Sequence, residues 1–567
     1  MDKINNNSLH GTWYLNLLCL ILIIVLNPVT FFFNCSPRVF TPDTVAYITM
    51  ARELFDKGFL YIPSWCHGDQ GLICPPLYPF LMACGNLLFG ALVRTSEWVS
   101  SLCALIALVP IYAYVRRISS RSNAVMISLL IGINYYYFVA AMTPLSEATF
   151  LLTLSYTLVL TLRLLEDSEK NRRALPLLLG LSCALVFLSR QIGIIILVFL
   201  VGFFLLHGLF SSRAERAVIL KKASFMVLGW LILVAPYTII IYYQTGHHPL
   251  QQSFSSAKYE VTTDDPEVLR EIQRIENIPN VTYGTVYAKR RLMRKLLPDA
   301  SEMLYRVDRK KEEKAGLFYQ FLSALKSPKD YAARLYHNTM HLAEPLGNFL
   351  LYLFLILCIS PFFVKSENRK LLDRLLLPLF ILFYLLVVSC FTDRIPRYIY
   401  ILFPFALMHI AGELFVCFHK VTNALRIRFS ILIFLVIAYA FFLLVIPHYF
   451  TELSVSSKLQ HVETQFESFR KKVNGEPVFS LSPFSSYLSG GSCRLLPNDS
   501  LEKVVKYGKK TGVRWLLVDR TESALSEIYF YTNAEWYRSA NLQREYPHLV
   551  RFCCETADGS FSLYEIL

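Results

Sequence analysis

Long apolar segments follow one another along most of this chain, and polar or charged residues gather between them. Each apolar segment has about 20 residues, the length that a helix needs to cross the hydrocarbon core of a bilayer. The pattern predicts a polytopic α-helical membrane protein with about eleven membrane-spanning helices. The predicted spans lie near residues 12–33, 95–115, 123–141, 145–164, 174–189, 191–210, 224–243, 346–364, 375–391, 397–418 and 429–447.

Two further segments, both in the predicted loop 34–94, have helical patterns without the length of a span. Val45–Phe55 has apolar residues on one side and charged residues on the other, which is typical of an amphipathic helix on a membrane surface. Leu77–Phe89 is apolar but short, and it follows Pro75 and Pro76. We interpret it as a re-entrant or interfacial helix. The alternative, an early spanning helix, would invert the topology of everything that follows.

The pattern divides the chain into a membrane domain, residues 1–447, and a soluble C-terminal domain, residues 448–567. The membrane domain carries a charged insertion at 244–345, which either covers a site or forms a solvated helical cap. The C-terminal part alternates helix-like and strand-like segments, an order that predicts a small α/β domain. Helices are expected at 457–471 and 501–511, and strands at 477–481, 513–518 and 561–566.

The charge of the chain indicates its topology. Only 17% of the residues are charged, against about 25% in soluble domains. The net charge of +14 would suit a nucleic-acid-binding protein, but the basic residues concentrate in alternate short loops. Such loops face the cytoplasm by the positive-inside rule, so no nucleic-acid partner is expected. These residues are Arg116, Arg117, Arg121, Lys170, Arg172, Arg173, Arg213, Arg216, Lys221, Lys222, Lys365, Arg369, Lys370, Arg374, Lys420, Arg426 and Arg428.

With an odd number of spans, the N-terminus is cytoplasmic and the C-terminus lies on the outer face. The loop 34–94, the insertion 244–345 and the C-terminal domain then share that outer face. Cys66 and Cys74 both lie in the first outer loop, eight positions apart, and an oxidising compartment could join them in a disulfide. The spacing alone is weak evidence for this pairing.

Polar residues that are unusual for a membrane protein fall at four separate outer turns. They are Asp43 after the first span, Glu147, Arg190, and the group Arg394, Arg397 and Tyr398. Each has an ordinary explanation, since Asp43 and Glu147 suit helix N-termini and the arginines suit a snorkelling position. Together, acids and arginines on one face suit a site that deprotonates a hydroxyl group and holds a phosphate.

With these residues in place, the chain resembles the C-type membrane glycosyltransferases, in particular the relatives of protein O-mannosyltransferases and lipid A aminoarabinose transferases. The resemblance extends over nearly the whole chain and rests on short motifs in the same order and on the same side of the membrane. These motifs are Asp43, Asp56-Lys57-Gly58, Pro75-Pro76-Leu77-Tyr78-Pro79-Phe80, Ser146-Glu147, Ser189-Arg190, Ala235-Pro236-Tyr237 with Gly246, Pro396-Arg397-Tyr398 and Ser562-Leu563-Tyr564.

The resemblance implies a reaction and a role for each candidate residue. A single sugar would pass from a polyprenyl-phosphate carrier to a hydroxyl group of an envelope lipid, glycan or protein, with inversion at the anomeric carbon. Asp43 would be the general base, and Glu147 and Tyr47 would bind the sugar or the acceptor. The leaving phosphate would be held by Arg190, Arg394, Arg397 and Tyr398, since the planar fork of arginine pairs bidentately with phosphate oxygens.

Two departures from these relatives matter. The aminoarabinose transferases have a basic residue just before the Pro-Pro pair, where this chain has Cys74. In the O-mannosyltransferases a second acid follows the catalytic one, where this chain has Thr44, and no β-trefoil-like insertion is evident. These differences favour a bacterial sugar transferase of unassigned substrate, a multi-pass protein of the inner membrane with a periplasmic C-terminal domain.

Other functions remain open. A transporter or lipid flippase without sugar-transfer chemistry would also contain intramembrane polar residues, but the paired halves typical of transporters are not evident. A membrane-anchored assembly protein, or a ligase that moves whole glycans, are further alternatives. No cofactor is required by the sequence. A divalent metal shared by Asp43 and Glu147 is possible but unsupported, because two carboxylates alone make a weak site.

Overall fold

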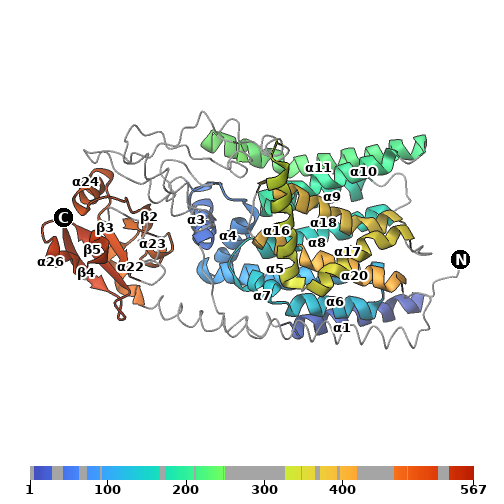
Figure 1. Cartoon of the computed structure of the whole chain (residues 1–567), viewed down its shortest axis with the longest axis horizontal. Helices are drawn as coiled ribbons and strands as arrows, with labels where there is room; N and C mark the ends of the chain where they lie inside the picture. Colours follow the sequence, from blue (N-terminus) through green and yellow to red (C-terminus); the bar gives the residue numbers. More distant parts are fainter. Residues whose placement is uncertain are drawn as a thin grey trace.

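The computed structural model of the protein describes residues 6–27, 42–62, 73–89, 92–166, 173–209, 212–246, 248–249, 326–346, 348–363, 371–391, 396–417, 465–481, 483–520, 535–539 and 541–567. A bundle of helices makes up one end of the molecule and a small sheet with short helices makes up the other (Figure 1). The helices α3 (Pro42–Lys57) and α4 (Leu77–Phe89) lie between these two parts.

Helices, most of them apolar, form most of the described chain up to residue 417. They are α1 (Asn6–Val25), α5 (Leu92–Ile118), α6 (Arg121–Ile133), α7 (Tyr135–Met142), α8 (Glu147–Glu166), α9 (Ala174–Ser189), α10 (Ile194–Leu209), α11 (Arg213–Thr245), α16 (Pro328–Leu346), α17 (Asn348–Phe363), α18 (Leu371–Phe391), α19 (Pro396–Tyr400) and α20 (Phe403–Cys417). Among the described residues, four helices are long and apolar enough to cross a membrane, or five spans if one bent pair is counted.

The four long helices are α5, α8, α10 and α11, and several shorter apolar helices are also present. The prediction that this is a helical membrane protein with several spans is therefore confirmed. The predicted number of about eleven spans stays a prediction, because the segment 429–447 lies outside the described residues.

The segment predicted as one span at 123–141 is broken into α6 and α7, whose axes differ by 62°. The break lies at Asn134, whose backbone is extended (φ −67°, ψ 135°). The Asn134 side-chain oxygen accepts a hydrogen bond from the backbone N–H of Tyr136 at 3.0 Å. This is an N-cap interaction, which satisfies a donor that the break would otherwise leave open.

The helices α9 and α11 pack closely because glycine lies at both sides of their contact. A Cβ atom on Gly180 would lie 1.9 Å from the carbonyl oxygen of Met226. A Cβ on Gly229 would lie 2.3 Å from the carbonyl oxygen of Leu177. Small residues that allow helix backbones to approach are typical of contacts within membranes. This pair of helices carries part of the candidate site described below.

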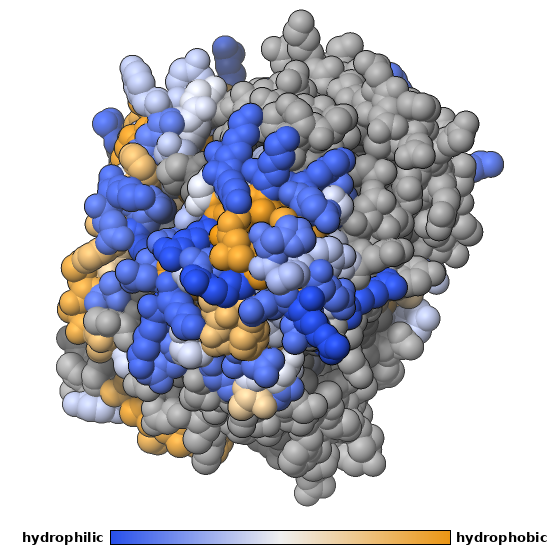
Figure 2. Space-filling view, turned by 90° about the vertical axis from the view of Figure 1, so that its left-hand side faces the viewer, coloured by the Kyte–Doolittle hydropathy of each residue, from blue (hydrophilic) through white to orange (hydrophobic). Residues whose placement is uncertain are grey.

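The surface of the helical part is apolar, as expected for a surface in contact with lipid. Large exposed apolar side chains include Leu205, Leu206 and Leu209 on α10, Ile239, Ile240 and Tyr243 on α11, and Ile356, Phe362 and Phe363 on α17. Seen from the end that carries the C-terminus, the described surface is instead mainly hydrophilic, with smaller apolar areas (Figure 2). The two ends of the molecule thus suit different surroundings.

The helices α3 and α4 pack on each other at the end of the bundle. Ile48 and Ala51 of α3 are fully buried against Tyr78 and Met82 of α4. The charged face of α3, including Asp56, stays exposed, so the amphipathic pattern of the sequence corresponds to one buried and one exposed side. The helix α4 has 13 residues, fewer than a span requires.

Residues 477–566 contain a five-stranded sheet of order β2-β1-β3-β5-β4. Its strands are β1 (Pro477–Ser480), β2 (Ser492–Leu495), β3 (Trp515–Asp519), β4 (Val550–Glu555) and β5 (Phe561–Ile566). The first three pair in parallel, and β5 pairs antiparallel with both β3 and β4. The accompanying helices are α22 (Glu467–Val473), α23 (Pro483–Leu488), α24 (Leu501–Thr511), η3 (Glu535–Arg538) and α26 (Leu542–Glu545).

The sequence pattern indicated β1, α24, β3 and β5 but missed β2 and β4. The strand β4 alternates poorly, because its residues after Val550 are half-buried or exposed, so its period-2 signal is weak. This region contains both strands and helices, and its assignment as a separate α/β domain stays a prediction. The division of the chain into domains at residue 447 stays a prediction.

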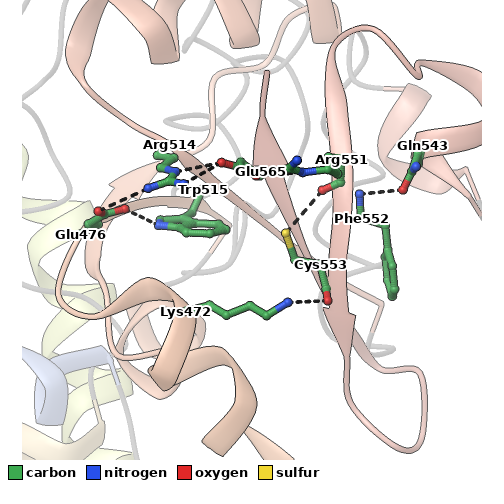
Figure 3. Close-up of polar contacts among 9 residues, drawn as sticks. All are labelled: Lys472, Glu476, Arg514, Trp515, Gln543, Arg551, Phe552, Cys553 and Glu565. Atoms are coloured by element: carbon green, nitrogen blue, oxygen red, sulfur yellow. Dashed lines mark hydrogen bonds and ion pairs between the residues drawn. The ribbon is translucent and has the colours of Figure 1, made fainter.

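Opposite charges connect the strands on one side of this sheet (Figure 3). Glu565 on β5 accepts hydrogen bonds from Arg551, its partner in register on β4, and from Arg514 at 2.8 Å. These two hydrogen bonds lower the pKa of the Glu565 carboxyl group below its ordinary value. The Arg514 guanidinium also lies over the ring of Trp515, 5.1 Å from its centroid, a favourable cation–π geometry.

The sheet region contacts the helical part through α23. Tyr487 packs against the buried cluster of Ile48, Ala51, Tyr78 and Met82 that joins α3 to α4. In Figure 1 this helix lies on the side of the sheet that faces α3. The C-terminal region therefore lies directly beside α3, which carries Asp43 in its first turn.

Candidate functional site

Asp43 lies in the first turn of α3, and Tyr47 follows it by four residues on the same side of the helix. The helix begins at Pro42, whose fixed φ angle and missing N–H suit a first helical position. Asp43 is thus the second helical residue and not the N-cap, which corrects the simplest alternative for its presence. A carboxylate there still gains from the positive end of the helix dipole, and it is half-buried.

Tyr47 is held in place by contacts with two other elements. Its hydroxyl lies 2.9 Å from Ser146 Oγ, and its ring meets that of Tyr78 edge-on, with centroids 5.2 Å apart. Burial raises the pKa of Tyr47, and the positive charge of Arg190 opposes part of that rise. The phenol is therefore protonated at neutral pH and has a proton to donate.

Ser146 and Glu147 stand where α8 begins. The backbone carbonyl of Ser146 accepts a hydrogen bond from Phe150 N–H at 2.9 Å, which is the first backbone hydrogen bond of α8. Both residues are buried, with exposed fractions of 0% and 8%. A buried carboxylate requires a partner, and Glu147 finds one in Arg190.

Arg190 is placed by a sharp turn between α9 and η1 (Gln191–Gly193). Its backbone is extended (φ −151°, ψ 130°) and its N–H donates to the carbonyl of Val186 at 3.1 Å. Gly193 closes the turn by donating to the Arg190 carbonyl at 2.7 Å. A Cβ on Gly193 would lie 2.5 Å from Val186 O, so the turn admits only glycine there.

The Arg190 guanidinium lies between an acid and an aromatic ring. Its Nη1 is 2.6 Å from Glu147 Oε1, and its Cζ lies over the ring of Tyr398 on α19, 4.6 Å from the centroid. The Nη1 has no well-aligned hydrogen bond within the described part of the chain, so charge and not hydrogen-bond geometry holds this pair. Tyr384 of α18 also lies within electrostatic range of Arg190.

Cys74 lies next to Asp43 and packs with Ala46 and Met50 of α3. Burial raises the pKa of the Cys74 thiol to about 12, and the Asp43 carboxylate adds to the rise. The Cys74 thiol is free in the structure, and the disulfide with Cys66 stays a prediction. Cys66 itself lies outside the described residues.

The remaining candidates are only partly within the described chain. Arg394 lies outside the described residues, and Arg397 belongs to α19 with a side chain that is not among those described. Among the described residues, no group of three or more His, Cys, Asp or Glu side chains is arranged to hold a metal ion.

The structure adds residues that the sequence analysis did not single out as site residues. They are Ser146, Gln191, Tyr237 and Tyr384, which lie beside the candidates described above. Gln191 carries a usable signal, since it is a polar residue directly after Arg190 at the start of an apolar span. Tyr384 carries none, because an aromatic residue inside an apolar helix is ordinary.

Comparison with known proteins supports the resemblance found in the sequence. Residues 74–240 match the family model described as dolichyl-phosphate-mannose-protein mannosyltransferase. Among curated protein sequences, no match was found. Among solved structures, the oligosaccharyltransferase of Archaeoglobus fulgidus in complex with zinc and sulfate is 12% identical, with a TM-score of 0.57 over 96% of this chain and 72% of that one.

The fold is similar to that of this oligosaccharyltransferase. A second structure, the oligosaccharyltransferase AglB of the same organism with an inhibitory peptide and a dolichol-phosphate, gives a TM-score of 0.52 at 12% identity, over 97% of this chain and 74% of that one. ArnT from Cupriavidus metallidurans bound to undecaprenyl phosphate is 10% identical over 99% and 98% of the two chains. Its TM-score of 0.42 is too low to support a structural argument.

The part of the chain that matches the mannosyltransferase family model includes Cys74, Glu147 and Arg190. Asp43 and Tyr398 lie outside the matched range and join the site through the fold alone. The buried cluster therefore combines residues from the matched segment with residues from both sides of it.

Proposed function

We propose that this protein is an inverting glycosyltransferase that moves a single sugar from a polyprenyl-phosphate carrier to a hydroxyl group of an envelope lipid, glycan or protein. The observation that carries the proposal is the buried ion pair of Arg190 and Glu147 (2.6 Å), joined to the Asp43 helix through Ser146 and Tyr47 (2.9 Å). One acid, one arginine and a protonated phenol thus lie close together where α3 covers the end of the bundle, and Asp43 lies on the same helix as the phenol.

In the proposed reaction Asp43 accepts the proton of the acceptor hydroxyl group. The acceptor oxygen then forms a bond to the anomeric carbon, while the bond from that carbon to the phosphate oxygen breaks on the opposite side. The electron pair of the broken bond leaves with the polyprenyl phosphate, and the configuration of the carbon inverts. General base catalysis of this kind contributes roughly 10²–10⁴-fold to the rate.

Arg190 is the residue we assign to the developing charge on the leaving phosphate. The uncommitted hydrogen-bonding geometry of its Nη1 supports this role, since a phosphate oxygen can accept from a donor that Glu147 does not align. Glu147 then acts by positioning the guanidinium, and Tyr398 supports it from the other face. Arg394 and Arg397 remain candidates for a second phosphate contact.

The comparisons support a carrier of this type. The AglB structure contains a dolichol-phosphate, and the matching family model describes transfer from dolichyl-phosphate-mannose. In this proposal the donor is therefore a polyprenyl-phosphate sugar, with its carrier in the membrane. In this proposal the N-terminus is cytoplasmic and the C-terminal region lies on the outer face of a bacterial inner membrane, an orientation that the basic loops favour.

Comparative mass spectrometry of envelope lipids, glycans and proteins tests the proposal. A deletion strain is complemented with the native gene, with Asp43→Asn, or with Asp56→Asn. Asp56 is the matched control, since it is an exposed acid on the same helix. We expect one sugar-sized mass to disappear in the deletion strain and to return with the native gene and Asp56→Asn, but not with Asp43→Asn.

Equal expression and melting temperature of the purified variants would show that Asp43→Asn is folded. Restoration of the sugar modification by Asp43→Asn would overturn the assignment of Asp43 as the base. If no single-sugar difference exists between the deletion and native strains, the transporter or flippase alternative becomes the better explanation.

A further inference from the structure

Two buried polar side chains beside Arg190 have groups without hydrogen-bond partners in the described part of the chain. They are the Gln191 amide, through Nε2, and the Tyr237 phenol, through its hydroxyl. Each residue is only 5% exposed. The two side chains lie close enough to interact with each other, but neither group makes a well-aligned hydrogen bond. Buried polar groups are nearly always hydrogen-bonded, so a polar ligand beside this pair would supply the aligned partners that both groups lack.

The turn after α9 explains why Arg190 and Gln191 serve different surroundings. The backbone of Arg190 is extended, and successive side chains along an extended backbone point in opposite directions. Arg190 reaches Glu147 and Tyr398, whereas Gln191 lies beside Tyr237 of α11. Arg190 therefore lies among charged and aromatic groups, whereas the next residue, Gln191, lies beside an uncharged phenol.

The side chains around Tyr237 are mainly apolar and aromatic. Tyr237 packs with Ile73 and Phe187, and the Phe187 and Tyr237 rings are 6.4 Å apart between centroids. Apolar walls with a few polar groups aimed inward are the usual composition of a small-molecule site. Neutral donors set among apolar walls suit the hydroxyl groups and C–H faces of an uncharged sugar.

Gln191 and Tyr237 also lie near the proposed base, Asp43. Ile73 borders Tyr237, and the next residue, Cys74, lies within electrostatic range of both Tyr237 and Asp43. The outer end of α11 is tied to the chain after α3, since Gln244 accepts a hydrogen bond from Leu60 N–H at 3.0 Å. A sugar bound beside Gln191 and Tyr237 would thus have Arg190 and Asp43 on neighbouring sides.

We propose that Gln191 and Tyr237 bind the hydroxyl groups of the carrier-linked sugar and select an uncharged sugar, while Arg190 faces the carrier phosphate. This inference rests on the proposed glycosyltransferase function. It assigns the sugar to a part of the site for which sequence analysis had named Glu147 and Tyr47. Glu147 instead forms an ion pair with Arg190, and Tyr47 forms a hydrogen bond with Ser146.

Binding measurements on the purified full-length protein separate sugar contacts from phosphate contacts. The probes are undecaprenyl phosphate alone and undecaprenyl phosphate carrying mannose, glucose, arabinose or 4-amino-arabinose. We expect the native protein to bind one neutral sugar conjugate more tightly than the bare carrier. Tyr237→Phe and Gln191→Leu should each weaken that binding by about fivefold, the usual size of one lost hydrogen bond, and leave the bare carrier unaffected.

The control variants give the experiment its contrast. Arg190→Gln should weaken the bare and the sugar-linked carrier equally. Tyr137→Phe removes the hydroxyl of a buried tyrosine that donates to the Ala104 carbonyl away from the site, and it should change neither affinity. Without ligand, Tyr237→Phe should melt close to the temperature of the native protein, because the lost hydroxyl makes no well-aligned hydrogen bond.

The outcomes separate this inference from the proposed function. If Tyr237→Phe and Gln191→Leu leave the sugar-linked affinity unchanged, or weaken the bare carrier equally, the sugar site is wrong while the carrier site stands. Preference for the 4-amino-arabinose conjugate would overturn selection of a neutral sugar. If the native protein binds neither the bare carrier nor any conjugate, the proposed function itself fails.

Discussion

Arg190 and Glu147 approach to 2.6 Å in the interior of the protein, yet the arginine nitrogen at that contact makes no aligned hydrogen bond. The two residues come from different helix ends, and both are at least nine-tenths buried. Two desolvated charges held mainly by Coulomb attraction are costly to separate. They also leave the guanidinium with donor capacity for a further anion.

Glu147→Gln should destabilise the protein and impair donor binding. Removing one charge leaves Arg190 buried and uncompensated, which costs about 3–5 kcal/mol. The exposed pair Lys471 and Glu467 provides the control, since Glu467→Gln should produce no measurable change. Melting of the purified variants, followed by intrinsic fluorescence, tests this expectation.

A double variant, Glu147→Gln with Arg190→Met, should recover much of the lost stability but not donor binding. The buried charge is then gone, and with it the contact to the phosphate. Equal destabilisation by Glu147→Gln and Glu467→Gln would show that the ion pair has no structural role.

Alkylation of Cys74 should report on the charge of Asp43. The thiolate is the reactive form, and a pKa of about 12 leaves only about one thiol in 10⁴ ionised at pH 8. Because the Asp43 carboxylate adds to this rise, Asp43→Asn should lower the pKa and speed alkylation at a given pH. While the pH is below the pKa, the alkylation rate should increase about tenfold for each unit by which the pH is raised.

Peptide mass spectrometry after timed reaction with iodoacetamide measures the modification at Cys74 alone. Asp56→Asn is the matched control and should leave the rate as in the native protein, because Asp56 is exposed on the far part of α3. The same Cys74 rate in the native protein and in Asp43→Asn would contradict the closeness of the two side chains.

A second buried ion pair, Arg374 with Glu413, should matter for stability and not for donor binding. Arg374 Nε donates to Glu413 Oε1 at 3.1 Å, and Ser360 Oγ donates to Glu413 Oε2 at 2.7 Å. These residues join α18, α20 and α17. Glu413→Gln should destabilise the protein by about 3–5 kcal/mol, since it leaves Arg374 buried without its charge partner.

The same preparation measures both properties, by melting and by binding of undecaprenyl phosphate. Arg374→Met with Glu413→Met should be far more stable than Glu413→Gln, because no charge is then buried. Loss of carrier affinity in a folded Glu413→Gln variant would show that this pair acts on the site and not only on packing.

The sequence analysis placed Arg374 with the basic residues of a cytoplasmic loop, and the structure corrects this. Arg374 is 2% exposed, four residues inside α18. Hydropathy counts a charged residue near the end of a span as part of the flanking loop, because it scores each side chain against water. Glu413, whose charge makes the burial of Arg374 tolerable, lies on another helix. No local sequence pattern identifies Glu413 as this partner.

The candidate site shows a similar division. Asp43, Glu147, Arg190 and Tyr398 stand out in the sequence because charged and polar groups at span ends are costly, and the structure places the last three in contact. Gln191 and Tyr237 escaped notice as site residues because each is ordinary on its own. Their interest arises only from lying together, buried and without hydrogen-bond partners among the described residues.

What the sequence determined by itself is the set of apolar helices, their order and most strands of the C-terminal region, since these follow from local periodicity and from the transfer energy of each side chain. Only the tertiary structure decided which charges meet, where the helix at Asn134 breaks, and that Cys74 lies free beside Asp43. Contacts between helices depend on how their surfaces fit together, and residues far apart in the chain leave no local pattern that records them.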